Sequence, residues 1–273
     1  MYESYWQLKQ KPFENHADPR FFFPGESHQA ALLKLRYAIE NHRGGAMLAG
    51  TSGSGKTLVA GMLRNSLDER FAPFVHLVFP QMSCAELTSY LADELEGCDT
   101  SAAGSGVPQS IRRIERFLAA NTNERRHAVV IVDEAHLLGS TETFETLRLL
   151  LNFESAGRPG LTLVLVGQTG LLPTFERMPQ FEERLGVKCL IRPFTESETA
   201  AYVNHRLKVA GATRTIIESD ALPTLYGLTH GIARQINRLC DLALLIGFAE
   251  ERTTITATQL ETVCQELVTV VPE

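Results

Sequence analysis

Five short apolar segments, separated by stretches of helical periodicity, constrain the fold of this chain more than any other feature of its sequence. Each segment is apolar at successive positions, as strands are when they are buried on both faces. Strands of this kind, with helices between them, form a parallel sheet that helices cover on two sides. We therefore expect an α/β fold with three layers, αβα, around a mostly parallel five-stranded sheet. The predicted strands lie at residues 46–49, 74–79, 128–132, 161–166 and 187–191.

The strand signals stop near residue 193, and the composition of the chain changes there. Residues 1–25 form a polar and aromatic lead-in with three prolines, and apolar residues recur at helical spacing from Glu26 to about Asn41. After residue 193 the pattern is helical only. Helices are predicted at about 195–210, 219–228, 231–249 and 256–268, and a loop between two helices is predicted at 96–110.

These signals predict three parts of the chain. Residues 1–43 hold the lead-in and the first helix, residues 44–193 hold the sheet, and residues 194–273 form a small all-α domain. The net charge of −6 and the isoelectric point of 5.8 argue against a protein whose main role is to coat nucleic acid. The most apolar run, residues 239–249, is too short to span a bilayer. The five cysteines lack the spacing of a disulfide framework or a zinc site, and we expect a cytoplasmic protein.

The sequence GTSGSGKT at residues 50–57 fits the pattern G-x-x-x-x-G-K-[ST] of a phosphate-binding loop. It follows a predicted strand and precedes a helix that opens at Lys56. Glycines let successive N–H groups point into one concavity, and the helix N-terminus adds its positive dipole end. Lys56 is expected to reach the β- and γ-phosphates of ATP, and Thr57 to ligate Mg²⁺; the alternative is a glycine-rich turn with a solvated lysine. The predicted nucleotide-binding residues are Gly50, Thr51, Ser52, Gly53, Ser54, Gly55, Lys56, Thr57, Leu58 and Asp133.

Two carboxylates follow the buried strand of VVIVDEAH, residues 129–136. Asp133 is expected to hold Mg²⁺ through its water shell, because this ion prefers oxygen ligands and keeps several waters. Glu134 is then placed to accept a proton from the water that attacks the γ-phosphorus, or to orient it. The alternative is a pair of acids that caps the next helix.

The strand at 161–166 is followed by another polar side chain, Gln168. Since the carboxyl ends of parallel strands lie at one edge of a sheet, Gln168 is expected between the phosphate loop and Glu134. There it would polarise the attacking water or touch the γ-phosphate; a simple turn glutamine is the competing interpretation.

With these motifs the chain resembles the AAA+ ATPases, and more closely the ExeA/GspA-type secretion ATPases and their transposition relatives of the TniB/TnsC kind. The resemblance covers almost the whole chain and implies a P-loop NTPase core followed by a helical lid. Besides the motifs at 50–57 and 129–136, it rests on KPFENHADPRFFFPGESHQAALLKLRYAI (11–39), LVLVGQ (163–168) and GIARQINRLCDLAL (231–244).

The resemblance also implies roles for arginines and aromatic residues. Arg234 corresponds to the arginine that contacts the γ-phosphate from the lid, with Arg238 as the weaker candidate and a solvated arginine as the alternative. Arg184, which precedes the last predicted strand, or else Arg177, corresponds to the finger that a neighbouring subunit supplies. Phe13 and the aromatic residues 21–23 line the adenine pocket or form a hydrophobic anchor.

Together these expectations describe an ATPase that binds and hydrolyses Mg-ATP at the interfaces of a homo-oligomer, a ring or a filament. Its client is a protein of a secretion or pilus-type assembly, or alternatively a transposase and double-stranded DNA. The basic residues that a DNA surface would use, or that are a solvated helix face, are Arg112, Arg113, Arg116, Arg125 and Arg126.

Overall fold

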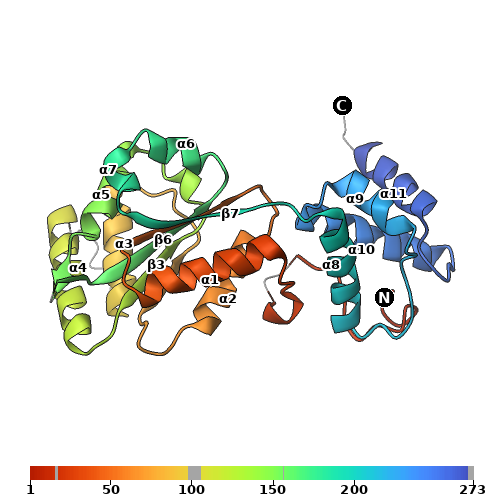
Figure 1. Ribbon diagram of the computed structural model, residues 1–273, viewed down its shortest axis with the longest axis horizontal. Helices are drawn as coiled ribbons and strands as arrows, with labels where there is room; N and C mark the ends of the chain where they lie inside the picture. Colours follow the sequence, from red (N-terminus) through yellow and green to blue (C-terminus); the bar gives the residue numbers. More distant parts are fainter. Residues whose placement is uncertain (16–17, 98–105, 156, 270–273) are drawn as a thin grey trace. The chain divides into compact units, whose positions relative to one another are not determined.

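The structure of this protein is a computed structural model that describes residues 1–15, 18–97, 106–155 and 157–269 (Figure 1). The chain divides into two compact units. The sheet unit contains Ser27–Gly50 and Val59–Ile191, and the helical unit contains Met1–Glu26, Thr51–Leu58 and Arg192–Glu273.

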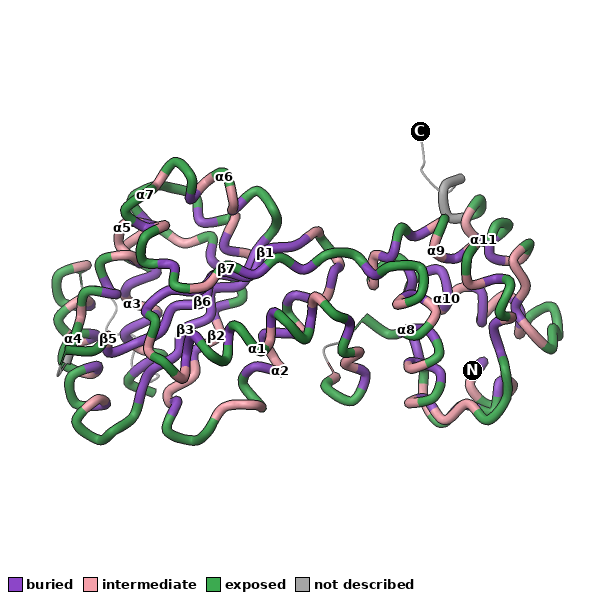
Figure 2. The backbone as a smooth tube through the Cα atoms, viewed as in Figure 1, coloured by how far each residue is buried: buried purple, intermediate pink, exposed green. Residues whose placement is uncertain are grey.

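A five-stranded sheet with the order β2-β3-β6-β1-β7 forms the centre of the sheet unit, and all of its strand pairs are parallel. The α/β fold with a parallel sheet between helices is thus confirmed (Figure 1). The strands follow the predicted segments because runs such as 128–132 are buried at every position (Figure 2). The strands are β1 (Gly45–Gly50), β2 (Phe74–Leu77), β3 (Ala128–Val132), β6 (Leu161–Gly167) and β7 (Leu185–Ile191); a short antiparallel pair consists of β4 (Glu154–Ser155) and β5 (Arg158–Pro159).

The parallel register gives the sheet two chemically distinct edges. Gly45 pairs with Leu163 of β6 and with Leu185 of β7, while Gly50 pairs with Ile191. All strands therefore begin at one edge, here called the amino edge, and end at the other, here called the carboxyl edge. The two edges are separated by about 20 Å, since a strand rises about 3.3 Å per residue.

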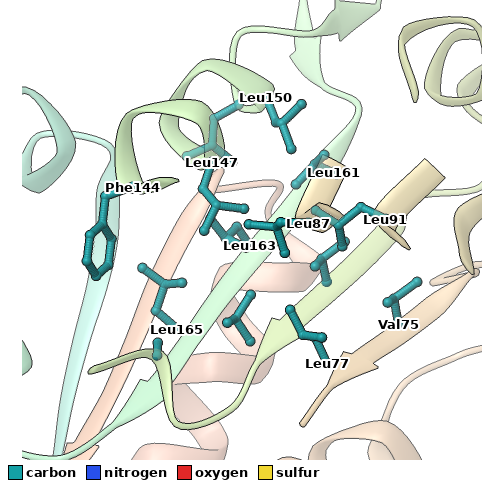
Figure 3. Packing of buried hydrophobic residues seen from close by; sticks show 14 of the residues in the cluster. Val75, Leu77, Leu87, Leu91, Phe144, Leu147, Leu150, Leu161, Leu163 and Leu165 are labelled. Atoms are coloured by element: carbon teal, nitrogen blue, oxygen red, sulfur yellow. The ribbon is translucent and has the colours of Figure 1, made fainter. Parts of the chain in front are cut away.

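One face of the sheet packs against three longer helices, the short 3-10 helix that follows β3, and the segment that follows β6. Successive strand residues point to opposite faces, so Leu161, Leu163 and Leu165 of β6 share this face. Figure 3 shows these leucines against Leu87 of α3 and Leu147 of α5. The elements that cover this face are α3 (Cys84–Glu96), α4 (Val107–Asn123), η2 (Ala135–Leu137), α5 (Thr141–Leu150), α6 (Leu171–Glu176) and α7 (Pro179–Glu182).

The other face of the sheet is formed by the alternate strand residues, such as Ile131 and Val164, which are fully buried. Two helices lie along this face, α1 (Glu26–Glu40) and α2 (Lys56–Ser66) (Figure 1). A weak hydrogen bond from the Cys189 thiol of β7 to the carbonyl of Ala31 links the sheet to α1.

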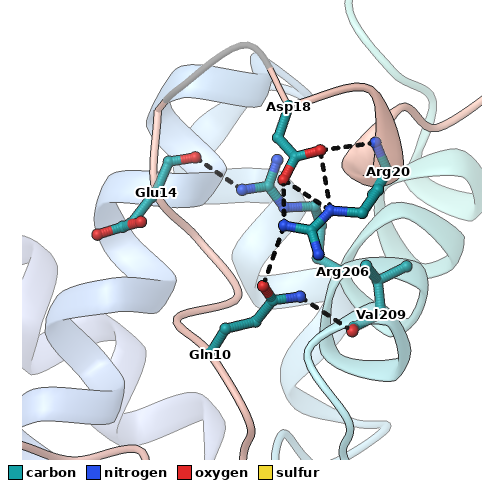
Figure 4. Close-up of polar contacts among 6 residues, drawn as sticks. All are labelled: Gln10, Glu14, Asp18, Arg20, Arg206 and Val209. Carbon is teal, nitrogen blue, oxygen red and sulfur yellow. Dashed lines mark hydrogen bonds and ion pairs between the residues drawn. The ribbon is translucent and has the colours of Figure 1, made fainter.

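The helical unit packs its own core of buried apolar residues, to which the lead-in contributes Trp6, Phe13 and Phe21. Arg206 of α8 holds the lead-in because its buried guanidinium donates to the carbonyls of Pro12 and Glu14. Figure 4 shows the contact with Glu14. The elements of this unit are η1 (Pro19–Phe21), α8 (Glu196–Val209), α9 (Ala221–Thr229), α10 (Ala233–Ala249) and α11 (Ala257–Thr269).

Several predicted boundaries differ from the structure by one or two residues, as at the start of β7, and two differences change the description of the chain. Helix α4 begins at Val107, inside the predicted loop 96–110, because Pro108 occupies the first turn of a helix, where its missing N–H is tolerated. Much of that predicted loop lies outside the described residues. Strand β2 ends at Leu77, two residues early, and leaves Val78 and Phe79 exposed. Among the described residues, no helix combines the length and apolar character needed to cross a membrane.

Candidate functional site

The loop of residues 51–55 follows directly on β1 at the carboxyl edge and leads into α2 at Lys56. Gly53 and Gly55 have backbone φ angles of 76° and 91°, a left-handed region that other residues adopt only at a cost. The loop therefore needs glycine at these two positions to turn from the strand into the helix. This conformation, ahead of a helix N-terminus, is the one that binds phosphate groups through backbone N–H donors.

Lys56 is almost fully buried, with 6% of its surface exposed, although a lysine is seldom buried without an anionic or polar partner. Its ammonium donates a hydrogen bond of 2.9 Å to the backbone carbonyl of Thr51. The ammonium is thus held inside the curve of the loop. A buried cation within a glycine loop at a helix N-terminus fits a polyphosphate.

The N-terminus of α10 lies against this loop within the helical unit. The backbone N–H of Arg234 donates to the carbonyl of Gly53 at 3.1 Å, and its guanidinium lies 3.4 Å from the hydroxyl of Ser52. A Cβ on Gly53 would lie only 2.7 Å from the Cβ of Arg234. Glycine at position 53 is therefore required twice, by its own φ angle and by the approach of α10.

A cavity of about 720 Å³ lies beside Arg234 in the helical unit. Phe13, which also belongs to the core of the unit, lines this cavity, whereas Phe21 and Phe23 pack into that core. Arg238 also lines it, one helical turn after Arg234. The complete lining consists of Phe13, Glu14, Asn15, Arg234, Arg238, Asp241 and Leu242.

The two acids lie at the carboxyl edge, directly after β3. Asp133 is buried, and its Oδ1 accepts the backbone N–H of Glu134 at 2.8 Å. Glu134 has a φ of 48°, a left-handed conformation that is uncommon for a residue with a side chain. Strained backbone of this kind concentrates at functional sites, where the surrounding structure holds it.

Two histidines lie beside these acids, and the sequence motifs had predicted no role for either of them. His76 of β2 places its Nε2 atom 3.6 Å from Oδ2 of Asp133. His136 places its Nδ1 atom 3.3 Å from Oε2 of Glu134, and the same Nδ1 accepts the backbone N–H of Gln168 at 3.4 Å. His136 therefore joins the end of β3 to the end of β6. Two sequence signals could have indicated them: a histidine inside an apolar strand, and a histidine two residues after the acid pair.

Arg184 lies at the other edge of the sheet from the acids. It precedes β7 at the amino edge, where its carbonyl accepts the N–H of Gly45 at 3.1 Å. Its exposed guanidinium donates to the side chain of Asn152. Arg177, the other candidate, is exposed at the end of α6.

The structure thus groups the predicted site residues in three places. The loop and Arg234 come together in the helical unit, Asp133, Glu134 and Gln168 share the carboxyl edge of the sheet, and Arg184 lies at the amino edge. Gly50 is the last, buried residue of β1; Thr57 is exposed in the first turn of α2 and Leu58 is half-buried. Of the other loop residues, Ser54 is buried and Ser52 is exposed.

Comparison with known proteins identifies the family of this chain. A family model described as an AAA domain matches residues 39–175, half of the chain. The chain belongs to the AAA+ family. It is also 32% identical, over 252 residues, to the General secretion pathway protein A of Aeromonas hydrophila. That similarity covers 91% of this chain but 45% of the relative, so the chain spans about half of the relative's length. The predicted resemblance to the ExeA/GspA type is confirmed.

Solved structures similar to this AAA+ protein show the same fold at low sequence identity. The Cdc6p structure from Pyrobaculum aerophilum gives a TM-score of 0.72 at 16% identity and covers 96% of this chain and 74% of its own. The structure of the Aeropyrum pernix ORC2 protein in its ADPNP-ADP complexes gives a TM-score of 0.71 at 18% identity and covers 94% of this chain and 72% of its own. The structure of the Aeropyrum pernix ORC1 protein in complex with DNA gives a TM-score of 0.69 at 16% identity and covers 96% of this chain and 69% of its own.

Proposed function

We propose that this AAA+ protein binds and hydrolyses Mg-ATP at the interfaces of a homo-oligomer and energises or regulates a secretion or pilus-type assembly. One observation carries the nucleotide proposal. The ammonium of Lys56 is buried inside a loop whose two left-handed glycines lead into a helix N-terminus. Three independent features, the positive charge, the dipole and the backbone conformation, thus favour an anion at the same place.

The residues of the loop and of the carboxyl edge divide the chemistry between them. Lys56 would bind the β- and γ-phosphates, and Thr57 and Asp133 would hold Mg²⁺, leaving its other positions to phosphate oxygens and water. When bound, Mg²⁺ would neutralise charge on the phosphates. Among the described residues, no group of three or more histidine, cysteine or acidic side chains forms a metal site, so the ion would depend on the nucleotide.

Glu134 would act as the base, or orient the attacking water. The hydrogen bond from its N–H to Asp133 ties its backbone to the proposed magnesium ligand. His136, at 3.3 Å from its carboxylate, would restrict the directions in which that carboxylate points. Gln168 would position the same water, and Arg234 would contact the γ-phosphate from the helical unit.

The position of Arg184 supports a site shared between copies of the chain. It lies about 20 Å from the carboxyl edge of its own sheet, counted along β7. No side chain spans that distance, so Arg184 would serve only the nucleotide of a neighbouring copy. An arginine supplied in this way stabilises charge on the transferring phosphoryl group and couples hydrolysis to assembly.

The similarity to General secretion pathway protein A favours a protein client over DNA. Of the basic residues that a DNA surface would use, Arg113 is neutralised by ion pairs with Asp93 and Glu96 at 2.8 and 2.6 Å. Binding of duplex DNA in the presence of Mg-ATP, measured as salt is raised, decides between the clients. A steep loss of affinity with salt would report phosphate contacts and replace the secretion proposal.

Calorimetry with the Lys56→Ala variant tests the nucleotide site. We expect ATP affinity to fall by at least about a hundredfold, because a buried charge-assisted contact to the phosphates is lost. Lys34→Ala is the matched control, since Lys34 is exposed on α1. Unchanged ATP affinity in Lys56→Ala, with a folded protein by circular dichroism, would overturn the proposal.

A further inference from the structure

A second basic cavity lies in the sheet unit, at the amino edge. Its volume is about 460 Å³, and it is here called the amino-edge pocket. The buried ring of Phe71 forms part of its wall, with the guanidinium of Arg70 4.9 Å from the ring centroid. Its charged and titratable lining residues are His42, Arg70, Arg125, Arg126, His127 and Arg158.

The charge of this pocket is only partly compensated. Arg70 and Arg126 make long ion pairs in solvent, at 3.5 Å to Asp68 and 3.6 Å to Glu124. Such exposed pairs are weak and leave most of the positive field in place. Among the described residues, no ion pair involves Arg125 or Arg158, and no acidic residue lines the pocket.

Two histidines connect the pocket to the interior of the sheet. Nδ1 of His42 lies 2.9 Å from Nδ1 of His127, and Nε2 of His127 lies 2.8 Å from the hydroxyl of Thr162, a buried residue of β6. Burial lowers the pKa of His127 to about 3, and burial together with Arg158 and Arg70 lowers the pKa of His42. Both rings are therefore neutral at pH 7, and one Nδ1 must donate to the other.

Two of the six described non-glycine residues with a left-handed φ line this pocket. His42 follows α1 with a φ of 52°, and Arg125 follows α4 with a φ of 61°. Positions just after a helix that adopt this left-handed region are usually glycine, because a Cβ there is unfavourable. Each of the two helices is thus followed by a residue with an unfavourable backbone conformation, and both side chains line the same cavity. Strained residues of this kind are often found at ligand-binding sites, and here both contribute a basic side chain to the pocket.

We infer that the amino-edge pocket binds a small phosphate-bearing anion, separate from the proposed ATP site. Guanidinium groups recognise phosphate through charge-assisted hydrogen bonds, and four of them converge here around an aromatic wall. His42 would add a donor once the anion lies beside it, because a nearby negative charge favours the protonated ring. The competing explanation is that these basic side chains only stabilise the C-terminal ends of α1 and α4, which carry the negative end of the helix dipole.

Proton NMR of the histidine rings with inorganic pyrophosphate provides a readout local to the pocket. Pyrophosphate is expected to shift the resonances of His42 and His127 and to raise the pKa of His42. The Lys56→Ala variant, which lacks the proposed ATP site, should show the same shifts. The double variant Arg125→Ala, Arg158→Ala should weaken this binding about tenfold or more, because two charge-assisted contacts are lost. Arg112→Ala, Arg116→Ala, on the exposed face of α4, is the control and should bind normally.

Each outcome of these measurements either supports or overturns the inference. A response to pyrophosphate supports the inference. A response to a short duplex oligonucleotide alone would overturn it, because the ligand would then be a nucleic acid and not a small anion. No response to both would overturn it. A double variant with normal pyrophosphate binding and a lower melting temperature would overturn it too, in favour of the helix-end explanation. ATP binding that survives in the double variant separates this result from the proposed function.

Discussion

The two edges of the central sheet carry opposite chemistry. At the carboxyl edge the strands are followed by the glycine loop and by the acids Asp133 and Glu134, whereas the amino edge gathers Arg184 and the basic residues of the amino-edge pocket. Parallel topology explains the separation, because helices that connect parallel strands begin near one edge and end near the other. Helix N-termini favour anions and C-termini favour cations. The helix dipoles thus favour anions at the carboxyl edge and cations at the amino edge.

The largest effect is expected at the carboxyl edge. Glu134→Gln should lower ATP turnover by about a hundredfold to ten-thousandfold and leave ATP binding intact, because an amide cannot accept the proton. Phosphate release and calorimetry measure the two properties. Glu142→Gln, in the first turn of α5, makes the same chemical change at an exposed position and should have no effect. Wild-type turnover in Glu134→Gln would remove Glu134 from the mechanism.

A smaller but still large effect is expected from the opposite edge. Arg184→Ala should lower turnover about a hundredfold or more, since a charge that stabilises the transferring phosphoryl group is lost. Mixing it with Glu134→Gln protein should restore part of the activity, because mixed interfaces combine an intact Arg184 with an intact Glu134. Arg177→Ala serves as the comparison. Failure of the mixture to recover would show that the two edges do not cooperate between copies.

The amino edge should also make stability depend on pH. His127 has a folded pKa of about 3 against an ordinary value of 6.5, so the unfolded chain binds a proton that the folded chain does not. The contribution of neutral His127 to the free energy of unfolding is therefore complete above pH 6.5 and is lost as the pH falls toward 3. Between pH 7 and pH 5.5 the free energy of unfolding should fall by about 1 kcal/mol through this group. Urea unfolding of the wild type and of His127→Gln compares the two slopes; equal slopes would contradict a neutral buried His127.

The smallest expected effect is a gain in stability. Arg125→Gly should raise the free energy of unfolding by about 0.5–1 kcal/mol, because glycine adopts a φ of 61° without strain. Arg126→Gly, at a residue outside the left-handed region, should give no gain. Thermal unfolding of both variants tests this. A destabilised Arg125→Gly would mean that the guanidinium contributes more to the fold than the strain costs.

Much of the fold follows from local sequence. The buried strands are continuous apolar runs, and the glycine loop and the acid pair stand directly after two of them, so their position at the carboxyl edge requires only parallel topology. No local sequence pattern predicts the pairing of His42 with His127. These residues are 85 positions apart, and α1 must pack on the sheet before they meet.

Contacts between the side chains of different helices also cannot be predicted from the sequence. The sequence shows Arg113 as one of several exposed basic residues, whereas the structure pairs it with two acids of α3. The left-handed backbone of Glu134 is likewise invisible, because acidic residues usually adopt ordinary φ angles. What the sequence omits is the geometry produced by packing between distant segments.

The placement of Arg184 on the far side of its own sheet has a consequence for how copies of the chain would associate. Contacts that join unlike surfaces, front to back, are not self-complementary, so they build rings or open helices rather than two-fold dimers. An open assembly of this type has two different ends: one terminal copy presents acids without an arginine, and the other presents an arginine without acids. Growth and disassembly would then be directional, and a partner that covers one end would control the whole array.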